Sequence, residues 1–229
     1  MAYSELVESL KGKLIVSVQA YPGEPMRHPE TMAQIARACE LGGAAAIRCQ
    51  GLSDISAIKG RVEIPVIGLW KEGHEGVYIT PTLRHARACI HAGADVVALD
   101  ATDRSRPDGR TFEETVAALR AESDVLIMAD CMTMDDIRRA VAAGCDLVST
   151  TLSHNKAAID TTLDDGPDIA LLKQATTEFP GIAIICEGHV HTPQDAKDAL
   201  DAGAWAVVSG TAITHPTSIT SWFAAALED

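Results

Sequence analysis

Short apolar runs alternate with amphipathic stretches along most of the chain. Eight runs have the length and the β-branched content of buried strands, and they cover residues 14–20, 44–49, 65–70, 95–100, 125–130, 146–151, 182–187 and 205–210. Between them, apolar residues three or four positions apart predict helices at 29–41, 82–91, 112–122, 134–143 and 193–202. This alternation of strand and helix predicts a parallel sheet.

A weak internal repeat favours closure of that sheet into a barrel. Glycine-containing motifs at 41–44, 92–95, 143–146 and 202–205 precede the even-numbered strands, where glycine can supply the left-handed conformation that ends a helix. Their spacing of roughly fifty to sixty residues fits a fourfold βαβα repeat better than an open sheet. We therefore expect residues 1–229 to form a single (β/α)8-barrel (TIM-barrel) domain.

The composition agrees with this fold and limits the partners. Hydrophobic residues make up 47% of the chain and aromatic residues 4%, a mixture that suits closely packed helices around buried parallel strands. The net charge of −13 opposes binding to nucleic acid or to an anionic membrane, since both require a positive surface. A small molecule is the expected partner, and any site for an anionic group must be local.

Two further features of the sequence indicate the cellular compartment of the protein. Residues 1–13 lack a basic-then-apolar signal pattern, and no apolar run approaches the roughly 18 residues needed to span a bilayer, so we expect a cytoplasmic protein. The six cysteines form no CxxC pair and lie mostly in apolar stretches, which predicts reduced thiols packed in the core.

Polar residues close almost every predicted strand. In a barrel the active site lies at the carboxyl ends of the strands, so these residues are candidates for the pocket. A single polar residue there is usually the start of a solvated loop, whereas a complete set indicates a functional site. The set comprises Gln19, Arg48, Lys71, Asp100, Asp130, Thr150, Thr151, Glu187, Gly210 and Thr211.

Lys71 is the candidate with the clearest chemistry. It follows the apolar run at 65–70, and a lysine at such a position can lose solvation and acquire a lowered pKa. It would then act as a base or as a Schiff-base nucleophile. The alternative interpretation is a surface cation after a strand.

The last two strand ends carry glycines that suit a phosphate site. Gly188 follows Glu187, and Gly210 precedes Thr211, so backbone amides can approach a ligand closely at both places. Many barrels bind phosphate in the loops after strands seven and eight. Tight turns would explain the same glycines equally well.

Other constellations are weak. His154, His189 and His191 lack a framing carboxylate motif, so no metal is predicted. The chain has no GxSxG elbow, no Walker A pattern and no GxGxxG after the first strand, which argues against a serine triad, nucleotide hydrolysis and dinucleotide binding. Cys131 has no nearby base and is assigned either to packing or to a position that supports the site residues.

Taken in order, several blocks of the chain resemble the bacterial N-acetylmannosamine-6-phosphate 2-epimerases. The block at 98–109, Ala-Leu-Asp-Ala-Thr-Asp-Arg-Ser-Arg-Pro-Asp-Gly, is the most distinctive. The others lie at 15–25, 46–51, 65–71, 77–82, 128–130, 148–153, 187–193 and 209–216.

The resemblance implies a cofactor-free barrel enzyme that inverts C2 of an N-acetylhexosamine 6-phosphate in sialic acid and amino sugar breakdown, and it favours a homodimer. Lys71 and Glu187 match the family's catalytic residues. Gln19 and Arg48 would hold the carbonyl and N-acetyl end, and Asp130 would join Glu187 in a polar network. By the same resemblance Asp100 and Thr151 complete the substrate-binding set, and Gly188, Gly210, Thr211 and His215 would contact the phosphate.

The chain departs from the commoner family pattern in three places. His189 stands where a longer basic residue often follows Glu-Gly, and His215 stands where arginine often precedes the proline. The loop at 154–166 lacks the usual Gly-Tyr after Thr-Leu-Ser. All three departures concern the expected phosphate end of the site.

Two other functions fit part of the pattern. In a class I aldolase Lys71 would form a Schiff base, which borohydride would trap, whereas a proton-carrying lysine leaves no adduct. A barrel that only binds a sugar phosphate would show a broken polar ring with intact phosphate loops, which is the reverse of what this sequence shows. A final apolar helix at 218–227 would cap the barrel base or bury against a neighbouring subunit.

Overall fold

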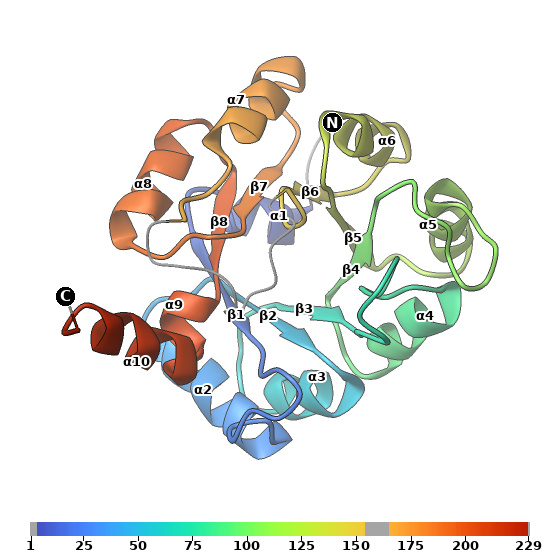
Figure 1. Ribbon diagram of the computed structural model, residues 1–229. Coiled ribbons are helices and arrows are strands. Elements are labelled where there is room, and N and C mark those ends of the chain that lie inside the picture. The colour runs from blue at the N-terminus through green and yellow to red at the C-terminus, as the bar shows by residue number, and fades with distance from the viewer. Residues whose placement is uncertain (1–3, 154–164, 229) are drawn as a thin grey trace.

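In residues 4–153 and 165–228, which the computed structural model describes, eight parallel strands close into a barrel (Figure 1). Each strand pairs with the next in the sequence, and β1 pairs with β8. The predicted (β/α)8 barrel is therefore confirmed. The strands are β1 (Leu14–Val18), β2 (Ala46–Gln50), β3 (Val66–Leu69), β4 (Val96–Asp100), β5 (Leu126–Asp130), β6 (Leu147–Ser149), β7 (Ile184–Glu187) and β8 (Ala206–Ser209).

Helices form a ring around the barrel (Figure 1). Three of them begin at a threonine whose side chain accepts a hydrogen bond from the amide three residues later, while the acidic residue there caps the threonine amide in return. The helices predicted between the strands are α2 (Pro29–Leu41), α4 (Leu83–His91), α5 (Phe112–Glu122), α6 (Met134–Ala142) and α8 (Pro193–Asp201), and all five are confirmed to within a residue at either end.

Other helices were not expected from the periodicity. They are α1 (Glu5–Ser9), α3 (Leu52–Lys59), α7 (Ile169–Glu178) and α9 (Thr211–Thr214). The last helix, α10 (Pro216–Ala225), begins two residues earlier than the pattern suggested. No helix in the described ranges is long and apolar enough to cross a membrane.

The base of the barrel is covered by α1 and not by the C-terminal helix. Val7 and Leu10 belong to the same buried cluster as the inward-facing strand residues, and the Trp205 indole donates a 2.9 Å hydrogen bond to the Val7 carbonyl. In Figure 1 α10 lies at the side of the barrel, in the ring between α8 and α2. The suggestion that the C-terminal helix caps the base is thus wrong, because α1 already fills that position.

Successive side chains of each strand point alternately into the barrel and toward the surrounding helices, and this divides the core into two parts. On β2, Ala46 faces the barrel interior and Ile47 packs under the helices, so Arg48 returns to the interior nearer the carboxyl end. The cysteines are all free, and all but Cys39 are buried, as predicted for packed thiols. The same alternation sends the strand-end polar residues into one space.

Candidate active site

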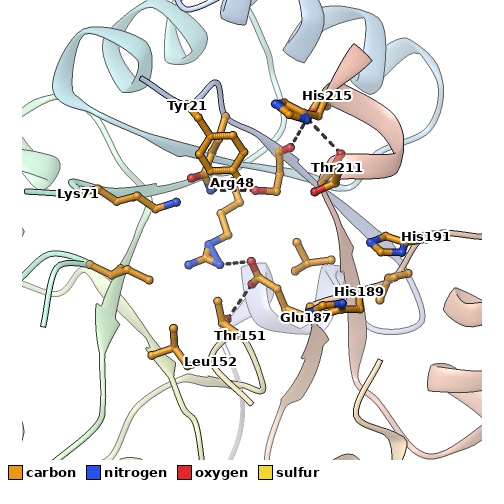
Figure 2. Close-up of a pocket in the computed structure, with 18 of the residues that line it drawn as sticks. Tyr21, Arg48, Lys71, Thr151, Leu152, Glu187, His189, His191, Thr211 and His215 are labelled. Carbon is orange, nitrogen blue, oxygen red and sulfur yellow. Dashed lines mark hydrogen bonds and ion pairs between the residues drawn. The ribbon is translucent and has the colours of Figure 1, made fainter. Parts of the chain in front are cut away.

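A cavity of about 220 Å³ opens at the carboxyl ends of the strands. Every predicted site residue except Asp100, Asp130 and Thr150 lines it. The lining comprises Ser17, Gln19, Tyr21, Arg48, Lys71, Tyr78, Ile79, Thr151, Leu152, Glu187, Gly188, His189, Val190, His191, Val208, Gly210, Thr211, Thr214 and His215. Figure 2 shows Lys71, Arg48 and Glu187 directed toward the same space.

Arg48 is the buried centre of this cavity. One of its guanidinium nitrogens donates to Asp130 at 2.6 Å, and another pairs with Glu187. Burial by itself lowers the pKa of Arg48, but the two carboxylates outweigh it and the pKa is raised. Arg48 therefore stays charged and joins the ends of β5 and β7 beneath the cavity.

Asp130 lies under the cavity wall and takes part in the site through its neighbours. Besides Arg48, it accepts a 2.9 Å hydrogen bond from the Thr151 hydroxyl. Burial raises the pKa of Asp130 to about 6; Arg48 opposes this shift, and the charge of Glu187 reinforces it. The predicted network of Asp130 with Glu187 is present in this geometry.

Lys71 follows β3 and is held in place by an isolated antiparallel bridge to Ile79. Burial is the largest cause that lowers its pKa, the charge of Arg48 lowers it as well, and Glu187 and Asp130 oppose them, with the result that the pKa is about 8. The ammonium lies 5.5 Å from the centre of the Tyr21 ring, within range of a cation–π contact. A lysine in this setting is partly neutral near pH 7 and can act as a base.

Two tyrosines in the cavity were missed by the sequence reasoning. Tyr21 comes from the loop after β1, and burial raises its pKa to about 12. Tyr78 comes from the loop after β3, and burial raises its pKa as well. Both hydroxyls therefore stay protonated as hydrogen-bond donors. The only sequence signal was their place in two of the resembling blocks.

The loops after β7 and β8 form the opposite wall. Gly188 has φ +107° and His189 has φ +56°, so the β7 loop turns through the left-handed region twice in succession. Gly210 lies so close to Ser17 that a Cβ added to it would be 3.1 Å from the Ser17 Cβ. A ligand at this wall can therefore approach the protein backbone closely.

His215 is held from two sides within this wall. Its Nδ1 is 2.6 Å from the Ser218 hydroxyl, and its Nε2 is 3.2 Å from a carboxylate oxygen of Glu24. Its ring meets the Tyr21 ring edge to face at 5.2 Å. Nδ1 is engaged by Ser218, whereas the buried Nε2 has a neighbouring carboxylate but no hydrogen-bond partner among the described residues, so direct contact of His215 with a phosphate stays a prediction.

Asp100 does not reach the cavity. Its carboxylate accepts hydrogen bonds from the amide and hydroxyl of Thr102 and pairs with Arg104 at 2.7 Å. The Asp100 carboxylate is therefore bound by residues of the loop that follows β4. Direct contact of Asp100 with a substrate stays a prediction.

A metal site is also without support in the described part of the chain. No group of three or more His, Cys, Asp or Glu side chains there is placed to hold a metal ion. His154, one of the histidines considered in the sequence, and most of the loop at 154–166 lie outside the described residues.

Comparison with known proteins points to a single family. Residues 32–229 match the family model described as "putative N-acetylmannosamine-6-phosphate epimerase". A protein of Cutibacterium acnes is 57% identical over 97% of this chain and 96% of its own length, and one of Corynebacterium glutamicum is 48% identical over 98% and 97%. Both carry the name "putative N-acetylmannosamine-6-phosphate 2-epimerase".

A solved structure gives the same result. The N-acetylmannosamine-6-phosphate 2-epimerase from Clostridium perfringens superposes with a TM-score of 0.89 at 37% identity, covering 99% of this chain and 98% of that one. The likeness therefore extends over the entire barrel.

Proposed function

The chain belongs to the N-acetylmannosamine-6-phosphate epimerase family, and we propose that it interconverts N-acetylmannosamine 6-phosphate and N-acetylglucosamine 6-phosphate with Lys71 as the proton carrier at C2. The observation that carries the assignment of Lys71 is its position at the cavity with a pKa near 8. A general base works best when its pKa lies close to the operating pH. The reaction joins N-acetylmannosamine and sialic acid breakdown to the common amino sugar pool.

The chemistry needs only proton transfers. Inversion at C2 requires the open-chain aldehyde, removal of the proton next to its carbonyl, and return of a proton to the opposite face. Neutral Lys71 takes the C2 proton. The carboxyl group of Glu187 stabilises the carbonyl oxygen of the substrate as the enolate forms. No organic cofactor or metal is called for in this scheme.

The remaining polar groups hold the substrate. Gln19 and Arg48 line the same cavity as Lys71 and hold the carbonyl and N-acetyl end, and Thr151 adds a hydroxyl next to Glu187. Because C2 must meet Lys71, the distal 6-phosphate is directed toward the wall formed by Gly188, Gly210 and Thr211. His215 lines the same cavity beside Ser218 and Glu24, and it adds a contact to the phosphate at that wall.

One experiment tests this function and its main competitor. Incubation with N-acetylmannosamine 6-phosphate in heavy water should incorporate deuterium at C2 of both epimers, as followed by proton NMR. Borohydride added during turnover should leave the protein mass unchanged, because a proton-carrying lysine forms no covalent adduct. A trapped adduct on Lys71 without exchange at C2 would instead identify an aldolase.

We also propose a homodimer that works in the cytoplasm, where phosphorylated sugars are retained. Apolar side chains exposed near the C-terminus support the assembly, because surfaces of this kind commonly mark protein contacts. Phe223 is 73% exposed and Leu227 is 87% exposed, and Ile213 lies nearby on α9. Light scattering on the purified protein measures the subunit number directly.

A further inference from the structure

The hydroxyl of Thr151 lies between two carboxyl groups. Thr151 Oγ1 is 2.9 Å from an oxygen of Asp130 and 3.0 Å from an oxygen of Glu187, and the Ser149 hydroxyl is 2.7 Å away. A threonine hydroxyl has one hydrogen and can donate it to only one carboxylate at a time. The second contact is favourable when the other carboxyl group carries a proton of its own.

The charge balance leads to the same conclusion. Arg48 is 1% exposed and Asp130 is 0% exposed, so an unbalanced charge at this point is costly. One guanidinium faces two carboxyl groups, and one proton shared by the two carboxyls would make the cluster neutral. Lys71 provides the alternative place for that proton, since it faces the same carboxyls from β3.

Other charged groups around Asp130 do not remove the need for a proton. Asp100 on β4 adds a further negative charge, and its own cation, Arg104, is paired with it. Tyr78 from the loop after β3 also faces Asp130 and stays neutral because burial raises its pKa. The cluster is therefore built to hold one proton in addition to the charge of Arg48.

We propose that Asp130, Thr151 and Glu187 share this proton, and that the Thr151 hydroxyl relays it between buried Asp130 and Glu187 at the cavity wall. The inference rests on the proposed function for its chemical purpose. Thr151 is then a positioning residue that acts through Glu187, and Asp130 is the store from which the proton comes.

The relay balances the enolisation step. Neutral Lys71 takes the C2 proton and becomes an ammonium ion. The stored proton starts on Asp130, and Glu187 starts ionised. Thr151 takes the proton of Asp130 while it passes its own hydrogen to Glu187, and Glu187 then gives that proton to the carbonyl oxygen. The products are a neutral enol, two carboxylates and two cations, so the net charge of the site is unchanged. The reverse sequence returns the proton to Asp130 when C2 is protonated again.

Three variants separate a relay from a purely structural hydroxyl. Thr151→Val keeps the shape and removes the relay, so kcat should fall by roughly 10²-fold, the low end for loss of a positioned acid. Thr151→Ser restores a hydroxyl and should recover most of the rate. Thr115→Val makes the same change at a buried site on α5, where the hydroxyl donates a hydrogen bond to the Thr111 carbonyl, and should leave kcat unchanged.

An infrared titration of the wild-type protein measures the stored proton without turnover. A carboxylic acid band should be present at pH 5 and fade as the pH rises through about 6, and Asp130→Asn should remove it. The relay is refuted if Thr151→Val keeps the wild-type kcat, if Thr151→Ser is as slow as Thr151→Val, or if no such band titrates. If wild-type protein exchanges no deuterium at C2, the proposed function fails, and the infrared result still decides whether the proton is shared.

Discussion

Between pH 6 and pH 8, kcat/KM for N-acetylmannosamine 6-phosphate should stay nearly constant, and it should fall on both sides. The productive enzyme needs neutral Lys71 and protonated Asp130 together. The pKa of Lys71 is lowered to about 8, so its base form grows as the pH rises toward 8. The pKa of Asp130 is raised to about 6, so its acid form declines above 6. Over the interval the two trends cancel.

The size of the productive fraction follows from the same two values. Near pH 7 about a tenth of the lysine is neutral and about a tenth of the aspartate is protonated, so roughly one molecule in a hundred has both forms. With the ordinary pKa values of 10.5 and 3.8, the fraction would be on the order of 10⁻⁷. Burial around Arg48 therefore raises the productive fraction by about four to five powers of ten.

Initial rates at low substrate concentration from pH 5 to pH 9.5 measure this profile. The substrate phosphate also titrates near pH 6, so the alkaline side is decisive. A fall of about tenfold per pH unit above 8 is expected for loss of the acid form. A rate that climbs tenfold per unit up to pH 8 and then stays level would show that Lys71 acts without a proton from Asp130. In Asp130→Asn the alkaline fall should disappear.

Five further results are expected. Lys71→Ala should lower kcat by roughly 10²- to 10⁴-fold while circular dichroism and calorimetric binding of the sugar phosphate stay close to wild type. Exhaustive chelation should leave the rate unchanged, and restoration of a lost rate by one divalent ion would contradict the scheme. Unphosphorylated N-acetylmannosamine should be a poor substrate, and Gly210→Val should weaken binding of the phosphorylated sugar, because its Cβ would be 3.1 Å from that of Ser17. Gly68→Ala should destabilise the fold by about 1–3 kcal/mol in a denaturant titration, since the added carbon would lie 2.7 Å from the Ala94 Cβ.

Much of the fold and most of the cavity could be predicted from the chain itself. The alternation of apolar runs and amphipathic stretches determines a parallel barrel, because each strand must be buried on both faces. In such a barrel all carboxyl ends meet at one opening, so polar residues there converge whatever their separation in sequence. Gln19, Lys71 and Glu187 line the cavity for this reason.

Residues that depend on a loop path could not be located in this way. Tyr21 and Tyr78 lie beyond the strand ends, and no periodicity indicates that their loops fold back over the cavity. Asp100 ends its strand as the other predicted site residues do, but its carboxylate accepts a hydrogen bond from Thr102 and pairs with Arg104. Short elements such as α1 carry too few turns for a clear amphipathic pattern.

The chemistry of the site was decided by the tertiary structure. The sequence determined that an arginine, an aspartate and a glutamate stand at strand ends, but Arg48 and Glu187 are 139 positions apart and pair only when the barrel closes. Closure also removes these groups from water, and this desolvation moves the pKa of Lys71 down and that of Asp130 up. A pKa depends on the dielectric and the charges around a group, and only the folded chain supplies both.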